Sequence, residues 1–496
     1  MNLADVIARN AAFAPGKVAL RFEGETISYG ALSGRIERAA AALAAEFGIG
    51  KGDRVAVLAL NHPDTLVLLY ACARLGAMLV PLNWRLAGPE LAYILGDADP
   101  ALLVADAHFA GEAAELAEAR PNLPVLSVGD GPASLSELIA SAREGSAGEG
   151  TLTDPLLVVY TSGTTGRPKG AVLAQQALVW NGVMSQHMHG LTSDDHVLTV
   201  LPFFHVGGLN IQTTPALHHG ATVTIHSRFA PDTTLAAIAD DRPTLTVLVP
   251  ATLGALLADP GFASADLSSL RAITTGSTYV PQGLIDPFER RGVPVLQVYG
   301  ATETCPISIY TRLGGPRPEG STGWPGPFCE AKIVDDGGRE LPDGASGEIM
   351  VRGPQILSAY WRNAAATRES IVEGWFRTGD IATRDATGAY YVHDRKKNVV
   401  ISGGENIYPA EIERVLLEHE AVAECAVVGR PDPRWGEVPV AHVVVRAGVA
   451  CTAEGLSAHV LSQLARFKAP KDFVFVDALP KSALGKVQHH LLRERA

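Results

Sequence analysis

The chain has 496 residues, of which 41 are Lys or Arg and 53 are Asp or Glu, so its formal net charge is −12. Hydrophobic residues make up 47% and charged residues 19% of it, which excludes a largely disordered protein and a coiled coil. The acidic balance gives no general attraction for nucleic acid or an anionic membrane, so we expect no nucleic-acid partner. An anionic ligand therefore needs a local binding site.

The five cysteines are scattered and contain no C-x-x-C pair. This pattern disfavours a disulfide framework or a structural zinc site and is typical of a reducing compartment. The first seventeen residues lack the basic region and apolar run of a secretory signal. The most apolar stretch, 245–258, is too short to span a bilayer. We therefore predict a cytoplasmic protein without an integral membrane segment.

Apolar strand-like runs alternate with helical patterns in the first part of the chain. Strands are predicted at 54–60, 78–81, 101–105 and 156–160, and an amphipathic helix at 64–75. Alternation at these lengths predicts an α/β fold with a largely buried sheet.

The composition changes near residue 394. From there to the C-terminus the net charge is +1, against −13 for the preceding part. The remaining hundred residues are enough for a small separate α+β domain. We place the boundary at 394–398 and predict two domains, residues 1–395 and residues 396–496.

The second domain has its own pattern of elements. Pro409 suits the first turn of a helix whose apolar face holds Ile412, Val415 and Leu416. A second helix and three strands are predicted from the residues that follow: Leu456, Val460, Leu461 and Leu464 on one side of the helix, and strands at 424–429, 440–446 and 473–477.

The strongest motif is LLVVYTSGTTGRPKG at 156–170, where a buried strand runs into a loop of glycines and hydroxyl residues. Glycines let backbone N–H groups converge on phosphate oxygens, and Lys169 adds a positive charge. The spacing differs from the G-x-x-x-x-G-K-[ST] of a Walker A loop. The motif predicts a phosphate-binding loop, although the same residues also occur in plain flexible turns.

TSGTTGRPKG resembles the phosphate loop of the adenylate-forming acyl-CoA synthetases, relatives of coumarate–CoA ligases, firefly luciferase and peptide-synthetase adenylation domains. Further motifs of that family occur in the family's order: YGATET at 299–304, GWFRTGD at 374–380, DRKKNVVISGGENIYPAEIE at 394–413 and KSALGKV at 481–487. The resemblance implies a large layered N-terminal domain of sheets flanked by helices, with a small mobile C-terminal α+β lid. It implies that a carboxylic acid, ATP and CoA give acyl-CoA, AMP and pyrophosphate through an acyl-adenylate.

The resemblance also assigns roles to residues at the motif positions. It implies catalytic roles for Lys486, Glu303 and His205, and Mg²⁺ ligation by Thr161 and Glu303. The residues implied to bind ATP or AMP are Thr161, Ser162, Gly163, Thr164, Thr165, Lys169, Gly276, Ser277, Tyr299, Gly300, Thr302, Glu303, Asp380, Arg395 and Lys486. The acyl pocket is implied at His205, Val206, Gly207 and Gly276, the CoA path at Gly403, Gly404 and Glu405, and a hinge at Lys397.

The chemistry explains these residue types. Attack of a carboxylate on the α-phosphate builds negative charge and expels pyrophosphate, so Mg²⁺ on oxygen ligands and a lysine are both needed. Lys486 matches the family's adenylation lysine, although a lysine so near the C-terminus is ordinarily just solvated. The carboxylate of Asp380 can accept both ribose hydroxyls.

Two departures bear on the substrate and the C-terminus. A malonate-activating branch of the family carries an arginine after a Val-Pro segment, where this chain has Ala255, so a dicarboxylate lacks its charge partner. We therefore expect a fatty acid or an aryl acid such as a phenylpropenoate. Relatives often carry basic residues after the catalytic lysine, where this chain has Gln488, His489 and His490.

Several alternatives stay open. The acyl acceptor could be a carrier-protein thiol, the adenylate could be oxygenated as in luciferase, or the chain could be a nucleotide-binding regulator without catalysis. The other histidines, including His187, His189, His218, His219, His489 and His490, lack acidic or cysteine partners at metal-ligand spacing. A homodimer is left open.

Overall fold

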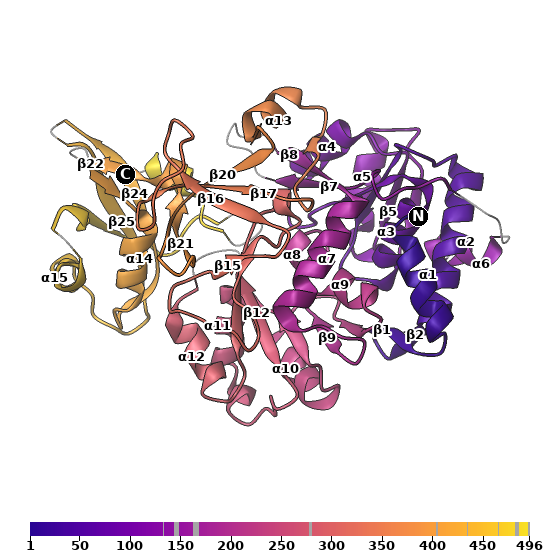
Figure 1. Ribbon diagram of the computed structural model, residues 1–496, viewed down its shortest axis with the longest axis horizontal. Coiled ribbons are helices and arrows are strands. Elements are labelled where there is room, and N and C mark those ends of the chain that lie inside the picture. The colour runs from indigo at the N-terminus through magenta and orange to yellow at the C-terminus, as the bar shows by residue number, and fades with distance from the viewer. Residues whose placement is uncertain are drawn as a thin grey trace. The chain divides into compact units, whose positions relative to one another are not determined.

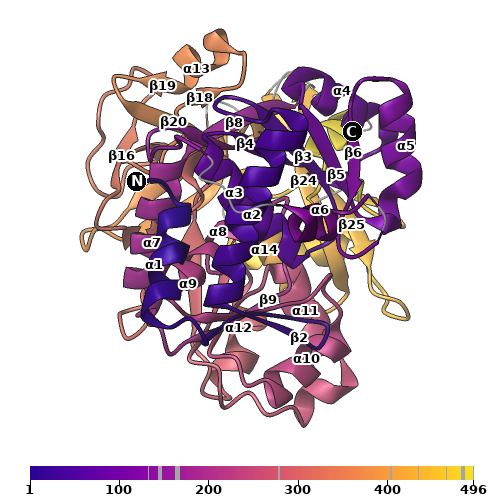
Figure 2. The same ribbon diagram turned by 90° about the vertical axis from the view of Figure 1, so that its right-hand side faces the viewer.

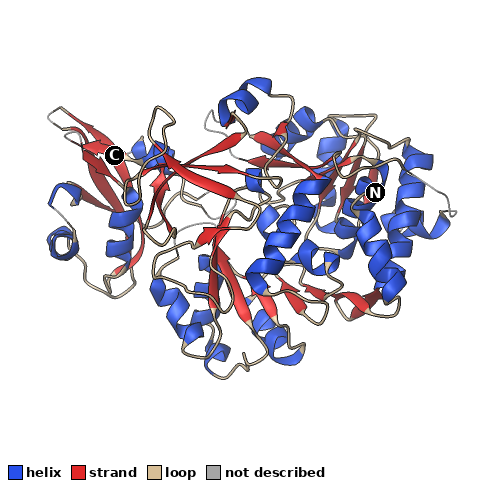
Figure 3. Cartoon of the chain, viewed as in Figure 1, coloured by secondary structure: helices blue, strands red, loops and turns tan. Residues whose placement is uncertain are grey.

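Helices and strands alternate through most of the chain (Figure 1 and Figure 3). The computed structural model describes residues 1–131, 133–142, 148–161, 168–276, 280–402, 405–433, 435–464, 466–481 and 486–494. The chain divides into two compact units, Met1–Ala331 with Val351–Phe376, and Lys332–Met350 with Arg377–Ala496. The domain boundary predicted at 394–398 refers to a hinge between moving parts as well as to a division in packing, so it stays a prediction.

The first unit contains a seven-stranded sheet that carries the phosphate-loop motif. Its strands, in spatial order, are β18 (Ala359–Tyr360), β8 (Lys169–Ala174), β7 (Pro155–Thr161), β4 (Met78–Pro81), β3 (Arg54–Leu58), β5 (Leu102–Ala105) and β6 (Val125–Ser127). The strands from β7 to β6 run parallel, and β8 and β18 extend the sheet antiparallel. All four strands predicted for this part of the chain are present.

A nine-stranded sheet forms the other sheet of the first unit. Its strands, in spatial order, are β15 (Trp324–Pro325), β14 (Ile309–Tyr310), β13 (Val295–Tyr299), β12 (Ala272–Gly276), β11 (Leu245–Val247), β9 (His196–Thr199), β10 (Thr222–Ile225), β1 (Val18–Phe22) and β2 (Glu25–Ser28). The strands from β13 to β1 are parallel, and the carboxyl ends of β12 and β13 lie side by side.

Helices cover these two sheets. Those of the first unit are α1 (Ala4–Phe13), α2 (Tyr29–Phe47), α3 (Pro63–Leu75), α4 (Gly88–Ala98), α5 (Ala110–Glu118), α6 (Leu135–Ser141), α7 (Gln175–His189), α8 (Val206–Asn210), α9 (Thr213–His218), α10 (Pro231–Asp240), α11 (Pro250–Ala258), α12 (Gln282–Glu289) and α13 (Ala364–Ser370), with 3₁₀ turns at η1 (Ala107–Phe109), η2 (Pro260–Ala263) and η3 (Thr302–Thr304).

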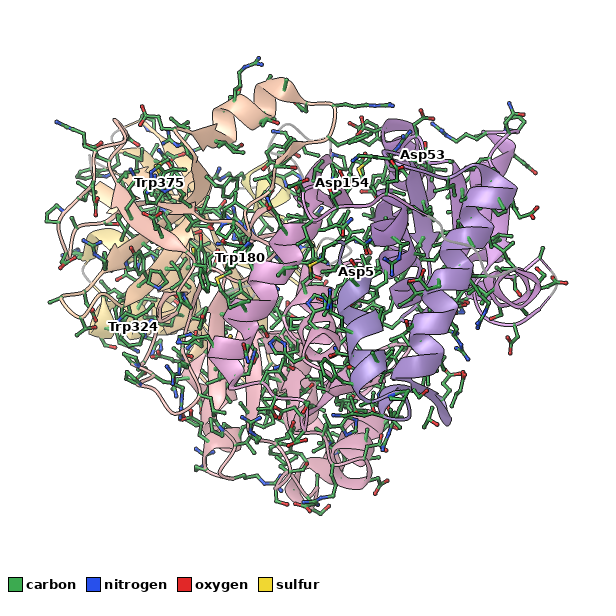
Figure 4. All side chains as sticks on the ribbon, turned by 45° about the vertical axis from the view of Figure 1, so that its right-hand side comes forward. Asp5, Asp53, Asp154, Trp180, Trp324 and Trp375 are labelled. Carbon is green, nitrogen blue, oxygen red and sulfur yellow. The ribbon has the colours of Figure 1, made fainter. Side chains whose placement is uncertain are left out.

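Helix α3 corrects one prediction. It was expected to be amphipathic, but nearly all of its side chains are buried. The reason is that α3 packs against α1 and α2 as well as against strands β4 and β7, and Figure 2 shows α2 and α3 side by side. An ion pair between Asp5 of α1 and Arg74 of α3, at 2.6 Å, also joins these helices (Asp5 is labelled in Figure 4).

A five-stranded sheet contains the places where the chain passes from one unit to the other. It has the order β16 (Glu330–Val334), β17 (Gly347–Arg352), β20 (Trp375–Arg384) and β19 (Ile371–Val372), and β21 (Tyr390–Arg395) pairs with β20. The long strand β20 carries the GWFRTGD motif from Trp375 onward.

The second unit also contains a small sheet of its own. Its strands are β23 (Glu405–Ile407), β22 (Val400–Ser402), β25 (Gly436–Val445) and β24 (Val422–Asp432), with β26 (Asp472–Phe475) beside β25. Its helices are α14 (Pro409–Leu417), α15 (Ala453–Gln463) and α16 (His489–Arg493), with 3₁₀ turns at η4 (Lys396–Asn398) and η5 (Arg466–Lys468). The elements predicted here are all present.

The core of this unit confirms most of the predicted apolar faces. Ile412, Val415 and Leu416 of α14 are fully buried, as are Leu456 and Val460 of α15. The side chain of Leu461 was predicted on the same side but is 45% exposed, because α15 presents a narrower face to the sheet than the sequence indicated. Within the described residues, no helix combines the length and apolar character that crossing a membrane requires.

Candidate active site

The phosphate-loop motif closes a hairpin between β7 and β8. Thr161 ends β7, Lys169 begins β8, and the two residues are paired across the ladder. The Thr161 hydroxyl lies 3.4 Å from the carbonyl oxygen of Lys169. The predicted loop residues Ser162, Gly163, Thr164 and Thr165 lie outside the described residues. The antiparallel pairing therefore brings both ends of the motif, a hydroxyl and a cation, to one edge of the sheet.

Glu303 lies in η3, directly after strand β13. The hydroxyl of Tyr360 donates a hydrogen bond to Glu303 Oε1 at 2.9 Å. The N–H of Leu357 donates to the Glu303 carbonyl oxygen at 2.7 Å. These two bonds hold both the side chain and the backbone of Glu303 against the segment that leads into β18.

Tyr360 links Glu303 to the phosphate-loop hairpin. Strand β18 pairs with β8, with Tyr360 opposite Ala171, and the Lys169 ammonium nitrogen lies 5.6 Å from the centroid of the Tyr360 ring. The Tyr360 side chain is 8% exposed. Sequence reasoning missed this residue, because Tyr360 reaches Glu303 and Lys169 only through strand pairing between segments far apart in the chain.

Gly276 and Gly300 lie where two neighbouring strands end. Gly276 pairs with Val298 of β13, and a Cβ on Gly276 would sit 2.3 Å from the carbonyl oxygen of Val298. A Cβ on Gly300 would sit 1.5 Å from the carbonyl oxygen of Pro306. Both positions therefore require glycine for packing alone. Tyr299 precedes Gly300 at the end of β13, Thr302 begins η3, and Ser277 lies outside the described residues.

His205 stands at the N-terminal cap of helix α8, and its carbonyl oxygen accepts the N–H of Leu209. Val206 is buried, while His205 and Gly207 are half-buried. Asn210, at the end of α8, donates to the sulfur of Cys305 at 3.6 Å. This contact links helix α8, which follows His205, to Cys305, which lies two residues after Glu303.

An aromatic ring lies beside His205, and a second ring contacts the first. The rings of His205 and Phe204 have centroids 4.9 Å apart, and Trp84 meets Phe204 edge to face at 5.8 Å. The guanidinium of Arg85 lies 4.8 Å from the Trp84 ring centroid. Sequence reasoning had assigned no role to Trp84 or Arg85, which lie some 120 residues before His205.

In the second unit, strand pairing brings Asp380 and Arg395 together. They are opposite each other on β20 and β21, and Arg395 Nε lies 2.7 Å from Asp380 Oδ1. A second guanidinium nitrogen of Arg395 donates to the Thr378 carbonyl oxygen at 3.1 Å. The Asp380 side chain is 8% exposed and that of Arg395 is 48% exposed. The pair therefore presents a fixed carboxylate beside a partly accessible cation.

The remaining predicted residues of this unit lie between η4 and α16. Lys486 is exposed and is followed by Val487, which forms a bridge with Lys481. Lys397 lies in η4 and Glu405 begins β23, but their side chains are outside the described part of the structure, as are Gly403 and Gly404.

Other histidines and the cysteines have structural roles. His189 is buried and bonds to the Thr274 hydroxyl at 2.7 Å, and burial lowers the pKa of His189 to about 4. His187 bonds to the Tyr310 hydroxyl at 2.9 Å. Four cysteines are buried as free thiols and Cys451 is half-buried. Within the described ranges, no group of three or more His, Cys, Asp or Glu side chains converges as a metal-ligand set would.

Comparison with known proteins identifies the family of this chain. The family model described as AMP-binding enzyme matches residues 7–361, and the model of the AMP-binding enzyme C-terminal domain matches residues 411–486. The chain belongs to the AMP-binding enzyme family. Membership of this family confirms the predicted resemblance and the predicted α/β fold with a smaller C-terminal domain.

Relatives with named activities are similar over their whole length. An indoleacetate–CoA ligase of Aromatoleum aromaticum is 48% identical, with 100% of this chain and 98% of that protein covered. A feruloyl-CoA synthase of an Amycolatopsis species is 41% identical, with 98% and 97% covered. The crystal structure of ATP-bound MatB from Rhodopseudomonas palustris superposes with a TM-score of 0.92 at 34% identity, covering 100% of this chain and 99% of that one. The predicted type of enzyme, an AMP-forming acid–thiol ligase, is confirmed.

Proposed function

We propose that this member of the AMP-binding enzyme family is an aryl-acid–CoA ligase. It activates an aryl carboxylic acid with ATP as the acyl-adenylate and transfers the acyl group to the thiol of CoA. The observation that carries the proposal is full-length similarity to two ligases whose named acids both bear an aromatic ring, indoleacetate and ferulate.

The residues around the phosphate-loop hairpin fit a bound Mg²⁺–ATP. Mg²⁺ prefers oxygen ligands, keeps several waters, and usually takes one or two carboxylates together with substrate phosphates. The Glu303 carboxylate and the Thr161 hydroxyl supply such oxygens, and the contacts through Lys169 and Tyr360 connect the two. When bound, the ion would neutralise charge on the phosphates. Glu303 and Thr161 would hold it, and Tyr360 would orient the Glu303 carboxylate.

The other assignments follow the family pattern and stay proposals. Lys169 binds phosphate oxygens beside the loop. Asp380 accepts the ribose hydroxyls while Arg395 fixes its orientation. Lys486 donates to the reacting carboxylate and α-phosphate. Rotation at Lys397 then lets Gly403, Gly404 and Glu405 line the approach of the CoA thiol.

The neighbourhood of His205 supports an aryl acid over a dicarboxylate. The Phe204 ring lies beside His205 and the Trp84 ring meets Phe204 edge to face, so an aromatic acid bound next to His205 would extend an existing group of ring contacts. At the position where a malonate-activating branch of the family carries an arginine, α11 has Ala255, which offers no charge to a second carboxylate. A fatty acid remains the competing substrate, because an apolar pocket separates homologous acids only by about 1–3 kcal/mol per methylene.

The test measures both half-reactions over one acid panel of indoleacetate, phenylacetate, ferulate, octanoate and malonate. Exchange of labelled pyrophosphate into ATP reports adenylation without CoA, and mass spectrometry reports the CoA thioesters. We expect exchange and thioester formation with the aryl acids to exceed those with octanoate and malonate. Exchange without CoA thioester would indicate another acceptor. Absence of exchange with every acid would contradict the proposal and favour a nucleotide-binding regulator.

A further inference from the structure

Two titratable side chains are in contact beside α16, the short helix that begins three residues after Lys486. His489 Nε2 lies 3.4 Å from Glu413 Oε1, and the two side chains are 24% and 20% exposed. Asp394, on strand β21, interacts with the charges of both. We name His489, Glu413 and Asp394 the His489 cluster.

The cluster joins four elements of the second unit. Asp394 Oδ2 accepts the N–H of Ala410 at 2.9 Å, in the first turn of α14. Glu413 Oε1 accepts the N–H of Val427, on β24, at 2.7 Å. Helix α14 packs against both β21 and β24 (Figure 1), and α16 also packs against β24. His489 is therefore the point at which the C-terminal helix contacts a polar network between β21 and α14.

The charges of the cluster favour the imidazolium. Burial alone lowers the pKa of His489, but the bond to Glu413 and the charges of Glu413 and Asp394 outweigh it, so this pKa lies above its usual value. Burial, aided by the charge of Glu413, raises the pKa of Asp394. Cys425 of β24 faces Glu413, and burial raises the pKa of its thiol, which stays neutral. Losing the proton of His489 would leave two carboxylates near each other without their cation.

The position of His489 in the chain connects this cluster to Lys486. The apolar side of α16 is anchored by Leu492, which is 1% exposed and packs with Ala426 and Val428. The N–H of Gln488 donates to the Pro480 carbonyl oxygen at 2.8 Å. Three residues span at most about 11 Å, so the placement of His489 limits where the Lys486 backbone can lie.

We propose that His489 in its imidazolium form is a positioning residue that, through Glu413 and Asp394, holds the segment carrying Lys486 ready for adenylation. The proposal rests on the proposed function, because it gives Lys486 the adenylation role. One proton at His489 then controls the first half-reaction and leaves the second, which does not use Lys486, unaffected. A lysine or arginine at this position would keep its charge at all physiological pH values, so histidine makes the arrangement pH-dependent.

The test compares His489→Gln and His489→Lys with the unmodified enzyme from pH 6 to 9. His490→Gln is the matched control, because His490 is the next residue of the same helix and is exposed. We expect pyrophosphate exchange by the unmodified enzyme to fall about tenfold as pH rises through the raised pKa of His489. His489→Gln should show the lower rate at every pH, and His489→Lys should keep the higher rate at alkaline pH. Thioester formation from preformed acyl-adenylate should be unchanged in all variants.

A second readout does not depend on activity. An NMR titration of the histidine ring protons, assigned by the signal lost in His489→Gln, gives the pKa of His489 directly, and Glu413→Gln should lower it. The proposal is overturned when Glu413→Gln leaves that pKa unchanged, or when His489→Gln and the control have the same pH profile. It is also overturned when both half-reactions of His489→Gln fall equally. Lys486→Ala distinguishes failure of this proposal from failure of the proposed function. Unchanged pyrophosphate exchange in that variant would refute the proposed role of Lys486 itself.

Discussion

Tyr360 offers the sharpest test of how the phosphate-loop hairpin and Glu303 act together. Tyr360→Phe removes only the hydroxyl that donates to Glu303 Oε1 at 2.9 Å, and the ring that faces Lys169 remains. A free glutamate side chain loses up to about 1.5–2 kcal/mol of rotamer entropy when it is fixed. Loss of a partner that orients a metal ligand typically costs about 10–100-fold in metal affinity.

We therefore expect the free Mg²⁺ concentration that gives half-maximal pyrophosphate exchange to rise at least about tenfold in Tyr360→Phe, which corresponds to about 1.4 kcal/mol. The stabilisation of the enzyme by Mg²⁺–ATP in a thermal melt should shrink in parallel. Tyr160→Phe is the matched control, because Tyr160 lies on β7 of the same sheet as Tyr360. Its hydroxyl donates to Asp97 at 2.6 Å instead of to Glu303. Equal Mg²⁺ midpoints for Tyr360→Phe and the unmodified enzyme, with both folded, would refute the reasoning, and so would equal shifts in the two variants.

Three further predictions concern Lys486, Asp380 and the cysteines. Lys486→Ala should slow pyrophosphate exchange by about 10²–10³-fold and leave thioester formation from preformed acyl-adenylate unchanged. The control is Lys481→Ala, which removes an exposed ion pair with Glu424 and should leave both rates unchanged. Asp380→Asn should raise the KM for ATP by about tenfold or more, because a hydrogen bond to a charged group contributes about 1.5–3 kcal/mol. The control is Glu348→Gln, which breaks an ion pair with Arg377 in the same sheet. It should lower the melting temperature without raising the KM for ATP. Alkylation of the native enzyme at neutral pH should modify Cys451 alone among the cysteines, because the other four are buried. Burial raises the pKa of the Cys72 and Cys329 thiols to about 12. Peptide mass spectrometry that found Cys72 modified in the folded protein would contradict this prediction.

Local signals in the sequence were sufficient for the elements that hold the site. The run of Val and Leu before the phosphate loop predicts β7, and the pattern around Pro409 predicts α14, because each element buries an apolar face that its own residues define. The prediction for α3 was wrong in its amphipathic character, and that for α15 was wrong at Leu461. In both cases the number of neighbours around the helix decides which faces are buried, and that number is a property of the packed structure.

The motifs predict the residues of the candidate site but do not show which residues hold them in place. The bond between Tyr360 and Glu303 exists because β18 adds to the edge of β8, and nothing near Glu303 in the chain indicates that pairing. The contact between His489 and Glu413 has the same origin, since α16 and α14 both pack on β24. Supporting residues of this kind come from topology, whereas residues that touch ligands come from recognisable local sequence.

The division of the chain into two units gives these supporting contacts a chemical consequence. Thr161, Lys169 and Glu303 belong to the first unit, and Asp380, Arg395 and Lys486 belong to the second. Each set is fixed by bonds inside its own unit: Tyr360 to Glu303 in the first, and Arg395 to Asp380 and His489 to Glu413 in the second. Motion at Lys397 therefore need not disturb Tyr360–Glu303 or Arg395–Asp380, because neither pair spans that residue. Asp394 precedes Lys397 while Glu413 and His489 follow it, so the proposed rotation at Lys397 would alter the His489 cluster, together with other contacts that cross this residue, such as the hydrogen bond between Ser346 and Tyr408.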